Sequence, residues 1–580
     1  MIKTLAKSIR QYKKESILSP VFMVGEVVME VLIPFLMAGL IDKGIEGGNM
    51  GYVAKMSLVL VIFAMLSLFF GAMSGSYAAS AATGFVANLR RDIFARVQTF
   101  SFSNIDKFST ASLVTRLTTD VNNVMMAYQA IIRQAVRGIL MIIFALIMAF
   151  NTNAQISIIF VCVIPVLAFG LAFISLYAHP IFVRAFKIYD KLNSVVQENL
   201  RGIRVVKSYV REETEKDKFN TISAELYSDF TQGQKRVAFN MPLMQLCIYT
   251  CLILISWVGA KLIVGHEMTT GELMSIIAYS MSILMSLMLL SMVFVMLIIS
   301  RASSERIAEV LHEESDLQNP KNPLTEVKDG SISFKAVNFS YVNDKNKLCL
   351  SNVDFDIKSG ETIGIIGGTG SSKTTLVQLI PRLYDVTEGV ALVGGADVRA
   401  YDIEALRNQV AVVLQSNVLF SGTIKENLRW GNENASDEEI KHACRLAQAH
   451  SFIETFPNGY DTYIEQGGSN VSGGQKQRLC IARALLKKPK ILILDDSTSA
   501  VDTKTDSQIR RAFREEIPNT TKLIIAQRIS SVEDADRIIV MEGGKVGAIG
   551  THEELLASNR IYQEVYNSQA QGGGDFDEEK

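Results

Sequence analysis

Long stretches without a charged residue place the strongest constraint on how this chain can fold. They lie between Lys55 and Arg90, Arg137 and Arg184, Arg236 and Lys261, and Glu272 and Arg301. Each exceeds the roughly 20 apolar residues that cross a bilayer as a helix, and the second holds two helices separated by the polar residues 151–153. A fifth apolar segment, Ile17–Ile41, carries only Glu26 and Glu30. The sequence therefore predicts six transmembrane helices before about residue 302.

The lysines and arginines of this region lie almost entirely on one side of the predicted membrane domain. Twenty-three occupy the N-terminal segment and the loops after the second and fourth helices, whereas the opposite side has only Lys43, Lys55 and Lys261. Because cytoplasmic loops are enriched in Lys and Arg, we expect both chain ends to be cytoplasmic in a multi-pass protein of the cell (inner or plasma) membrane. Residues 1–16 predict a basic amphipathic helix on the inner membrane surface and do not read as a signal peptide.

The composition changes after Arg301. A Pro-, Asn- and Lys-rich linker at 318–328 precedes alternating strand-like and helical runs, which are typical of an α/β domain with a mainly parallel sheet. We expect a helical transmembrane domain at 1–316 with two long cytoplasmic loops, an α/β domain at 329–567, and a disordered acidic tail at 568–580. The net charge of −1 lacks the basic excess of nucleic-acid-binding proteins, so no nucleic acid is expected as a partner.

A glycine-rich turn follows an apolar strand in the segment Glu361–Leu376 and opens a helix. Backbone N–H groups of such a turn surround phosphate oxygens, while its lysine reaches the β- and γ-phosphates and the next hydroxyl ligates Mg²⁺. The residues assigned to this phosphate site are Gly367, Gly370, Ser372, Lys373, Thr374 and Thr375. Ser372 replaces the second glycine of the G-x-x-x-x-G-K-[ST] pattern, and serine tolerates that turn less well. The alternative is a glycine-rich turn with no binding function.

Two more motifs lie further along the chain. An apolar strand, Ile491–Asp495, ends in a carboxylate, as a Mg²⁺ ligand beside a P-loop requires. Just upstream, Val471–Arg478 reads V-S-G-G-Q-K-Q-R and begins a helix that Ser472 would cap. The order of P-loop, S-G-G-Q, apolar strand with two aspartates, and Ser499–Asp502 resembles the nucleotide-binding domain of ATP-binding cassette transporters. With the six helices that precede it, the chain from 1 to 567 resembles a half-transporter of the exporter type.

This resemblance implies ATP and Mg²⁺ as cofactors and assigns roles to further residues. Tyr341 would stack on adenine, and Gln415 would sense Mg²⁺ and contact the membrane domain, so that Thr374, Gln415 and Asp495 form the metal site. The residues that would complete the nucleotide site of an opposing subunit are Ser472, Gly473, Gly474 and Gln475. Asp502 would communicate across the dimer, and segments near Phe108–Arg116 and Ile203–Tyr209 would form the coupling helices.

Three positions depart from the family pattern in ways that concern hydrolysis. Asp496 stands where the family has the glutamate that polarises the attacking water. Its carboxylate would lie about 1.5 Å further back, and misplacement of that order can cost about 10²-fold in rate. Gln527 replaces the switch histidine and cannot carry charge or shuttle a proton, and Gln466 takes the place of the usual coupling glutamate. The benign alternative is that Asp496 and Gln527 are tolerated variation.

From these departures we expect the chain's own site to bind ATP and hydrolyse it poorly. Its intact S-G-G-Q motif would complete a competent site in a second half-transporter that supplies Glu and His. The chain would then resemble one half of a heterodimeric bacterial multidrug-type exporter, which drives hydrophobic or amphipathic compounds across the membrane. The alternatives are a peptide or lipid exporter half and a nucleotide-gated regulatory subunit with little hydrolysis. Because no peptidase-like segment precedes the first helix, we do not expect leader-peptide processing.

Two features of the predicted helices bear on the substrate. Six methionines share one face of the sixth helix, namely Met274, Met281, Met285, Met288, Met292 and Met296. Such a face suits either a promiscuous apolar binding surface or ordinary packing against helices and lipid. Glu26 and Glu30 lie one turn apart in the first helix. They either favour cationic substrates or form a pair held by neighbouring helices or the inner headgroups.

Overall fold

The computed structural model describes residues 1–497 and 499–572, which form two compact units. The first unit contains residues 1–99 and 109–313, and the second contains residues 100–108 and the chain from 314 onward. The division falls close to the expected boundary at 316. The expected linker, 318–328, and a short segment from the membrane half both belong to the second unit.

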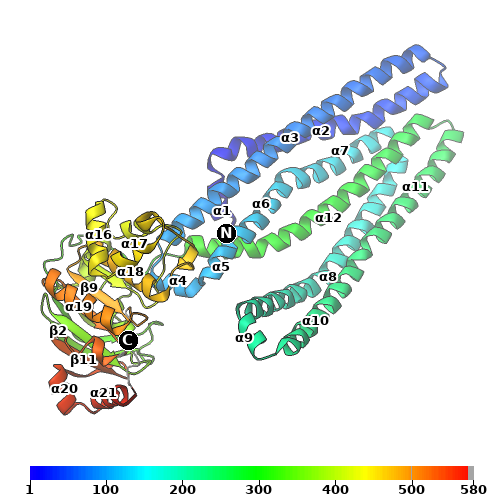
Figure 1. Ribbon diagram of the computed structural model, residues 1–580. Helices are drawn as coiled ribbons and strands as arrows, with labels where there is room; N and C mark the ends of the chain where they lie inside the picture. The colour runs from blue at the N-terminus through cyan, green and yellow to red at the C-terminus, as the bar shows by residue number, and fades with distance from the viewer. Residues whose placement is uncertain (498, 573–580) are drawn as a thin grey trace. The chain divides into compact units, whose positions relative to one another are not determined.

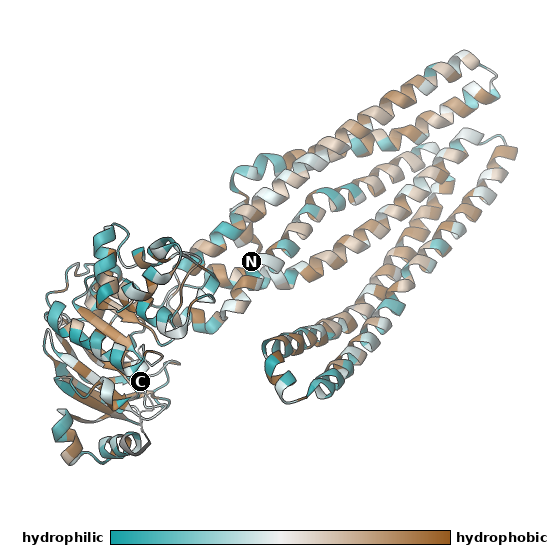
Figure 2. Ribbon diagram, in the orientation of Figure 1, coloured by the Kyte–Doolittle hydropathy of each residue, from teal (hydrophilic) through white to brown (hydrophobic). Residues whose placement is uncertain are grey.

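The first unit consists of six helical spans that are long and apolar enough to cross a membrane. They are Ile2–Glu46, Met50–Gln98, Thr110–Thr152, Ala154–Arg201, Glu212–Val264 and Thr270–His312. Their elements are α1 (Ile2–Ala6), η1 (Lys7–Tyr12), α2 (Lys13–Gly39), η2 (Leu40–Glu46), α3 (Met50–Gln98), α5 (Thr110–Thr115), η3 (Arg116–Asp120), α6 (Val121–Gln129), η4 (Ala130–Ala135), α7 (Val136–Thr152), α8 (Ala154–Arg201), α9 (Ile203–Ser208), α10 (Glu212–Ala238), α11 (Asn240–Val264) and α12 (Thr270–His312). Figure 2 shows α9 and the adjoining ends of α8 and α10 as largely hydrophilic, in contrast to the apolar α11.

Local capping explains where two of these helices begin. Asn153 accepts hydrogen bonds from the backbone N–H groups of Gln155 and Ile156, so the polar tripeptide turns the chain between α7 and α8 as expected. Thr269 and Glu272 form a reciprocal capping box at the start of α12. The apolar core of the unit joins α2, α7, α8, α11 and α12, which pack side by side in Figure 1.

The second unit is built around a six-stranded sheet with the order β12-β11-β3-β10-β9-β6. Neighbouring strands are parallel except β12, which pairs antiparallel with β11, as expected for a mainly parallel sheet. The strands are β3 (Thr362–Gly367), β6 (Val410–Val413), β9 (Ile491–Asp495), β10 (Thr521–Ile525), β11 (Arg537–Glu542) and β12 (Lys545–Gly550). Every residue of β9 and β10 is buried, which agrees with central strands covered on both faces.

A second sheet and several helices complete this unit. The antiparallel sheet has the order β2-β1-β4-β5, and β7 pairs with β8 in a short ribbon. These strands are β1 (Ile332–Phe339), β2 (Leu350–Ile357), β4 (Glu388–Val393), β5 (Ala396–Asp397), β7 (Gly422–Thr423) and β8 (Tyr463–Ile464). The α-helices are α4 (Phe102–Phe108), α13 (Lys373–Gln378), α14 (Ile403–Gln409), α15 (Ile424–Arg429), α16 (Asp437–Leu446), α17 (His450–Thr455), α18 (Gly473–Leu486), α19 (Thr503–Glu516), α20 (His552–Ser558) and α21 (Arg560–Gly572).

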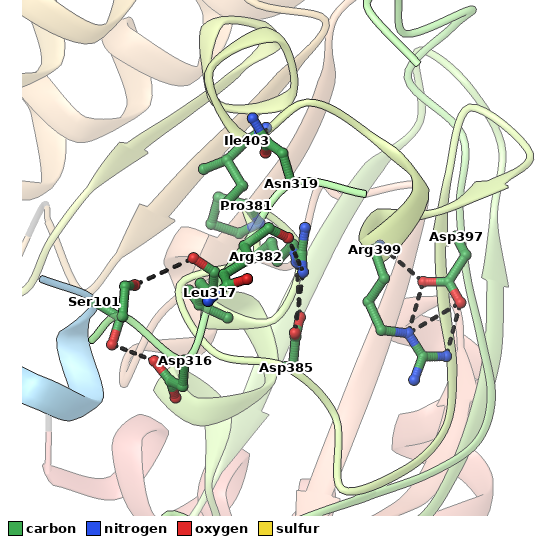
Figure 3. Close-up of polar contacts among 12 residues, drawn as sticks. Ser101, Asp316, Leu317, Asn319, Pro381, Arg382, Asp385, Asp397, Arg399 and Ile403 are labelled. Atoms are coloured by element: carbon green, nitrogen blue, oxygen red, sulfur yellow. Dashed lines mark hydrogen bonds and ion pairs between the residues drawn. The ribbon is translucent and has the colours of Figure 1, made fainter. Parts of the chain in front are cut away.

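Polar contacts attach the linker to the second unit (Figure 3). Buried Arg382 donates a hydrogen bond to the backbone carbonyl of Gln318 at 3.2 Å. The side chain of Asn319 accepts from the first backbone N–H of α14 at 2.9 Å. Ser101 donates to the carboxylate of Asp316, which ties the segment before α4 to the same stretch. These contacts explain why the linker and α4 belong to this unit.

The C-terminal helix extends further than the sequence predicted. α21 continues to Gly572, so residues 568–572 are helical where a disordered tail was expected. Gln569 holds this end in place, because its Oε1 accepts from the backbone N–H of Ile529 at 2.9 Å and its Nε2 donates to the carbonyl of Gln527 at 2.7 Å. The remainder of the expected tail, 573–580, lies outside the described residues.

Candidate nucleotide-binding site

Three neighbouring parallel strands position the candidate site at one edge of the six-stranded sheet. β3, β10 and β9 lie side by side and end at Gly367, Ile525 and Asp495. Ile525 pairs with Asp495, and the backbone N–H of Asp496 donates to the carbonyl of Ile525 at 3.0 Å. Because the carboxyl ends of parallel strands meet at the same edge, the loops after these strands converge there.

The turn after β3, which is the expected phosphate-binding loop, has backbone conformations that favour glycine. A Cβ on Gly367 would lie 2.3 Å from the carbonyl oxygen of Met541, so the close approach to β11 requires glycine here. Gly370 and Ser372 have φ angles of +81° and +69° in the left-handed region. Ser372 therefore adopts the conformation that favours the glycine it replaces, and its Cβ makes that conformation more costly.

Lys373 and Thr374 begin α13, and Thr374 contacts Asp495 at the end of β9. The Lys373 ammonium donates to the carbonyls of Gly367 at 2.7 Å and Gly368 at 3.0 Å, and burial lowers its pKa. The Thr374 hydroxyl donates to Asp495 Oδ1 at 3.0 Å. Burial raises the pKa of the Asp495 carboxyl, and a nearby cation would stabilise its ionised form. A hydroxyl and a buried carboxylate in contact fit the oxygen ligands that Mg²⁺ prefers.

Two of the three positions that depart from the family pattern, Asp496 and Gln527, contact each other directly. Gln527 Nε2 donates to Asp496 Oδ2 at 2.8 Å, and Gln415 Nε2 lies 3.5 Å from the same oxygen. Burial raises the pKa of the Asp496 carboxyl, and the hydrogen bonds from the two amides oppose that rise. Asp496 also has a left-handed φ of +48°. The structure thus brings Asp496, Gln527 and Gln415 together at the end of β9.

Tyr341 follows β1 and lies against the helix of the P-loop. Its hydroxyl is 3.0 Å from Thr375 Oγ1 and donates to Gln378 Oε1 at 3.2 Å. Thr375 is buried, so its hydroxyl joins Tyr341 to α13, a contact that the sequence did not predict. The Tyr341 side chain is 44% exposed and keeps surface available for a stacked base.

The S-G-G-Q segment begins α18 with a reciprocal cap. Ser472 Oγ accepts from the backbone N–H of Gln475 at 3.3 Å, and Gln475 Oε1 accepts from the backbone N–H of Ser472 at 2.9 Å. A Cβ on Gly474 would lie 2.8 Å from the carbonyl of Ala500, whereas one on Gly473 would make ordinary contact. Within the described part of the chain, no hydrogen bond joins these residues to the P-loop of the same chain.

The structure places several residues near the site that the sequence did not predict there. Buried Gln477 donates to Ser499 Oγ at 3.3 Å and accepts from the backbone N–H of Ala500 at 3.1 Å, so it joins α18 to the loop after β9. Gln569 holds the backbone after β10, and Tyr384 contacts Tyr341. For Gln477, the available sequence signal was its polar side chain on the buried side of α18, two positions after the S-G-G-Q motif.

The two expected coupling segments each contain a short helix. The segment near Phe108–Arg116 covers the last residue of α4, Ser109, all of α5 and the first residue of η3. Ser109, with a φ of +54°, separates α4 from α5, and helical periodicity alone could not locate this break. The second segment, expected at Ile203–Tyr209, coincides with α9, which has no buried residue. Asp502 caps α19 by accepting from the Thr505 N–H at 2.8 Å.

The two membrane carboxylates share one arginine. Arg137 of α7 pairs with Glu26 at 2.7 Å and with Glu30 at 2.9 Å. Glu26 is 7% exposed, and its second oxygen has no hydrogen-bond partner among the described residues. The hypothesis that a neighbouring helix holds the pair accounts for this geometry. None of the six methionines of α12 is buried, and Met292 is 70% exposed, so their face points away from the core of this unit.

Comparison with known proteins finds relatives along nearly the whole chain. Residues 16–310 match the family described as ABC transporter transmembrane region, and residues 350–499 match the ABC transporter family. The chain is 37% identical over 549 residues to the uncharacterized ABC transporter ATP-binding protein YfiB of Bacillus subtilis, with 95% of each protein covered. It is 30% identical over 576 residues to the ATP-dependent lipid A-core flippase of Desulfotalea psychrophila, covering 98% of this chain and 99% of that protein. A bacterial Atm1-family ABC exporter with ATP bound has the same fold, with a TM-score of 0.85, 22% identity, and coverage of 96% and 99%.

Proposed function

This chain belongs to the ABC transporter family and has the fold of an exporter half-transporter, and from that premise we propose that it binds ATP but hydrolyses it poorly at its own site. It acts as one half of a heterodimer. Its S-G-G-Q motif completes the active site of a second half-transporter, which supplies the catalytic glutamate and switch histidine. Hydrolysis at that partner site then drives export across the membrane.

The observation that carries this proposal is the 2.8 Å hydrogen bond from Gln527 to Asp496. A general base must lie within hydrogen-bond reach of the water from which it takes a proton. Asp496 is one methylene shorter than glutamate, and the glutamine amide occupies one of its oxygens. The amide stays neutral at physiological pH, so Gln527 offers no positive charge to a γ-phosphate. Both features slow hydrolysis and leave the phosphate loop intact.

ATP and Mg²⁺ fit the residues that surround this edge of the sheet. The P-loop backbone and Lys373 bind the phosphates, and the exposed face of Tyr341 stacks on adenine. Thr374, Asp495 and Gln415 supply the oxygen ligands of Mg²⁺, which when bound neutralises phosphate charge. The Thr374–Asp495 hydrogen bond of 3.0 Å holds two of these ligands together before any cation is added.

The S-G-G-Q segment supports an assembly of two subunits. It forms the N-terminus of a 14-residue helix, and such an end attracts anions. Since it makes no hydrogen bond to the P-loop within the described chain, we assign it to the nucleotide of the partner. The unequal distribution of Lys and Arg supports a cell-membrane protein whose two ends and nucleotide-binding domain are cytoplasmic.

A cavity in the membrane unit supports a hydrophobic or amphipathic substrate. It measures about 600 Å³ and lies between α8, α10 and α11, with Phe173, Tyr177, Phe239 and Leu246 among its apolar lining residues. Arg236 is its one charged lining residue, and it donates to the carbonyl of Tyr177 at 3.1 Å. Arg236 is also the last charged residue before the uncharged stretch of α11. An apolar wall with a cation at the membrane edge suits an amphiphile with an anionic head.

This cavity favours a lipid exporter as the second candidate. The similarity to a protein named as a lipid A-core flippase points in the same direction. A cationic drug would instead use the two carboxylates near Arg137, whose cluster has one more carboxyl group than guanidinium groups. Transport assays with anionic, neutral and cationic amphiphiles distinguish the two candidates.

The test of poor hydrolysis uses the heterodimer recovered by co-purification from the native membrane. The catalytic glutamate of the partner is changed to glutamine, so that the remaining ATP turnover reports this chain's site. In that background the pair Asp496→Glu with Gln527→His should raise hydrolysis by up to about 10²-fold, the range expected for a correctly placed base.

Two controls make the result decisive. Photolabelling of this chain by 8-azido-ATP should remain within about twofold of the unmodified chain, because neither substitution touches the P-loop. Lys373→Ala added to the double variant should abolish the gained activity, which assigns it to this site. Turnover by the unmodified chain alone at the rate of the intact heterodimer would refute the proposal.

A further inference from the structure

Tyr384 lies between the expected adenine position and α4. Tyr341 and Tyr384 pack edge-to-face with ring centres 5.1 Å apart, and Phe339 contacts both at 4.9 and 5.7 Å. On its other side, Tyr384 packs edge-to-face against Phe102 of α4 with centres 6.0 Å apart. Its hydroxyl donates to Asp106 Oδ2, also in α4, at 2.8 Å. One side chain therefore contacts both the residue assigned to adenine and the helix of the first cytoplasmic loop.

The backbone that carries Tyr384 is fixed independently of α4. Arg382, two residues earlier, is buried, has a left-handed φ of +52°, and pairs with Asp385 at 2.8 Å. The same guanidinium donates to the carbonyl of Gln318 in the linker. Burial and the hydrogen bond to Asp106 raise the pKa of the Tyr384 hydroxyl, so it remains a donor at physiological pH. The backbone from which the Tyr384 side chain extends is thus held in place by the contacts of Arg382.

We propose that Tyr384 is a positioning residue that links adenine bound at Tyr341 to the seating of α4. The proposal rests on the proposed function in one respect, because it takes Tyr341 as the residue that stacks on adenine. The Tyr341 hydroxyl is already bonded to α13, so a base stacked on its ring restricts the ring further. Edge-to-face packing is directional, and it passes this restriction to Tyr384. The Tyr384 hydroxyl then holds Asp106, and with it α4, more firmly when adenine is present.

The experiment measures hydrogen–deuterium exchange of the full heterodimer in nanodiscs, with and without Mg²⁺ and the non-hydrolysable nucleotide AMP-PNP. In the unmodified protein, the nucleotide should slow exchange of the peptide that covers 100–108. Tyr384→Phe keeps the ring and removes the hydrogen bond to Asp106. A hydrogen bond to a charged group accounts for about a 10- to 150-fold change in a local equilibrium. The variant should therefore lose most of the nucleotide-dependent slowing.

Further variants and one ligand control test whether the effect of adenine reaches α4 through the hydrogen bond between Tyr384 and Asp106. Asp106→Ala should reproduce the effect of Tyr384→Phe, whereas Asp106→Asn keeps an acceptor oxygen and should restore part of the protection. Tyr463→Phe removes the hydroxyl of an exposed tyrosine in β8 and should leave exchange of 100–108 unchanged. Magnesium tripolyphosphate, which lacks the base, should slow exchange at the P-loop but not in α4.

The outcomes separate this inference from the proposed function. Full nucleotide-dependent protection of 100–108 in Tyr384→Phe would overturn it, as would equal protection by tripolyphosphate. Photolabelling of this chain by 8-azido-ATP, resolved from the partner on a denaturing gel, checks that the variant still binds nucleotide. Asp106→Ala repeats the test outside the nucleotide site if Tyr384→Phe fails to fold. Because AMP-PNP is not hydrolysed, efficient catalysis at Asp496 would refute the proposed function and leave this result intact.

Discussion

Gln569 should control the mobility of the backbone that carries Gln527. Its side chain makes two hydrogen bonds, one from the Ile529 N–H at 2.9 Å and one to the Gln527 carbonyl at 2.7 Å. A neutral hydrogen bond contributes about 0.5–1.5 kcal/mol net, so Gln569→Ala removes about 1–3 kcal/mol of local stability. At tenfold per 1.4 kcal/mol, this corresponds to about 5- to 150-fold more frequent local opening. Gln569→Glu keeps the acceptor and loses the donor, so local opening should become about 2- to 12-fold more frequent.

Hydrogen–deuterium exchange of the peptide that spans residues 524–533 measures this opening, since exchange reports local unfolding. The matched control is Gln563→Ala on the same helix, because Gln563 Nε2 donates to the Leu556 carbonyl at 2.7 Å, and within the described chain no hydrogen bond joins its side chain to residues 524–533. The control should leave exchange at 524–533 unchanged. Equal acceleration by Gln563→Ala would show that any loosening of α21 suffices, and no acceleration by Gln569→Ala would refute the role of Gln569.

Three further predictions concern the phosphate loop and the membrane unit. Gly367→Ala places a Cβ 2.3 Å from a backbone carbonyl of β11. Overpacking of this kind costs about 1–3 kcal/mol, so 8-azido-ATP photolabelling should weaken by about 5- to 150-fold. In the control Gly368→Ala the new Cβ meets no atom within 4 Å, and this variant should label normally. Glu26→Ala removes a charge-assisted hydrogen bond from Arg137 and should cost at least about 1.5 kcal/mol, seen as a lower thermal unfolding midpoint; an unchanged midpoint would exclude a stabilising pair. Arg236→Ala should reduce transport of anionic amphiphiles more than neutral ones, and an equal reduction would exclude charge recognition by the cavity.

The sequence was most informative where a structural feature depends on neighbouring residues alone. Six spans follow from apolar length, because a bilayer imposes a minimum number of residues on any helix that crosses it. The P-loop, the carboxylate at the end of β9 and the capping box at Ser472 are likewise local patterns. The left-handed φ of +69° at Ser372 also follows from a local rule, since the P-loop turn has this conformation whichever residue occupies it.

Features that depend on contacts between distant segments were beyond sequence reasoning. The segment before α4 is held by the hydrogen bond from Ser101 to Asp316, 215 positions away. Gln569 falls within 568–580, where the sequence predicts a disordered acidic tail, yet its side chain bonds to the backbone 40 positions earlier. Tyr384 carries no motif of its own, and its importance comes from the two surfaces that it touches. In each case the sequence shows a polar or aromatic residue, but it does not show which distant residue that side chain contacts.

The contact between Asp496 and Gln527 changes how these two departures from the family pattern are understood. Taken separately, each looks like a lost function, one a shortened base and the other an uncharged switch. The structure shows them as partners, because a single amide hydrogen satisfies a carboxylate oxygen at 2.8 Å. A longer glutamate would extend past this amide, and a histidine at 527 would present a ring where the amide now reaches. Residues in contact do not act additively, so restoring either family residue alone leaves the other mismatched, and only the double replacement rebuilds a base and a switch that fit each other.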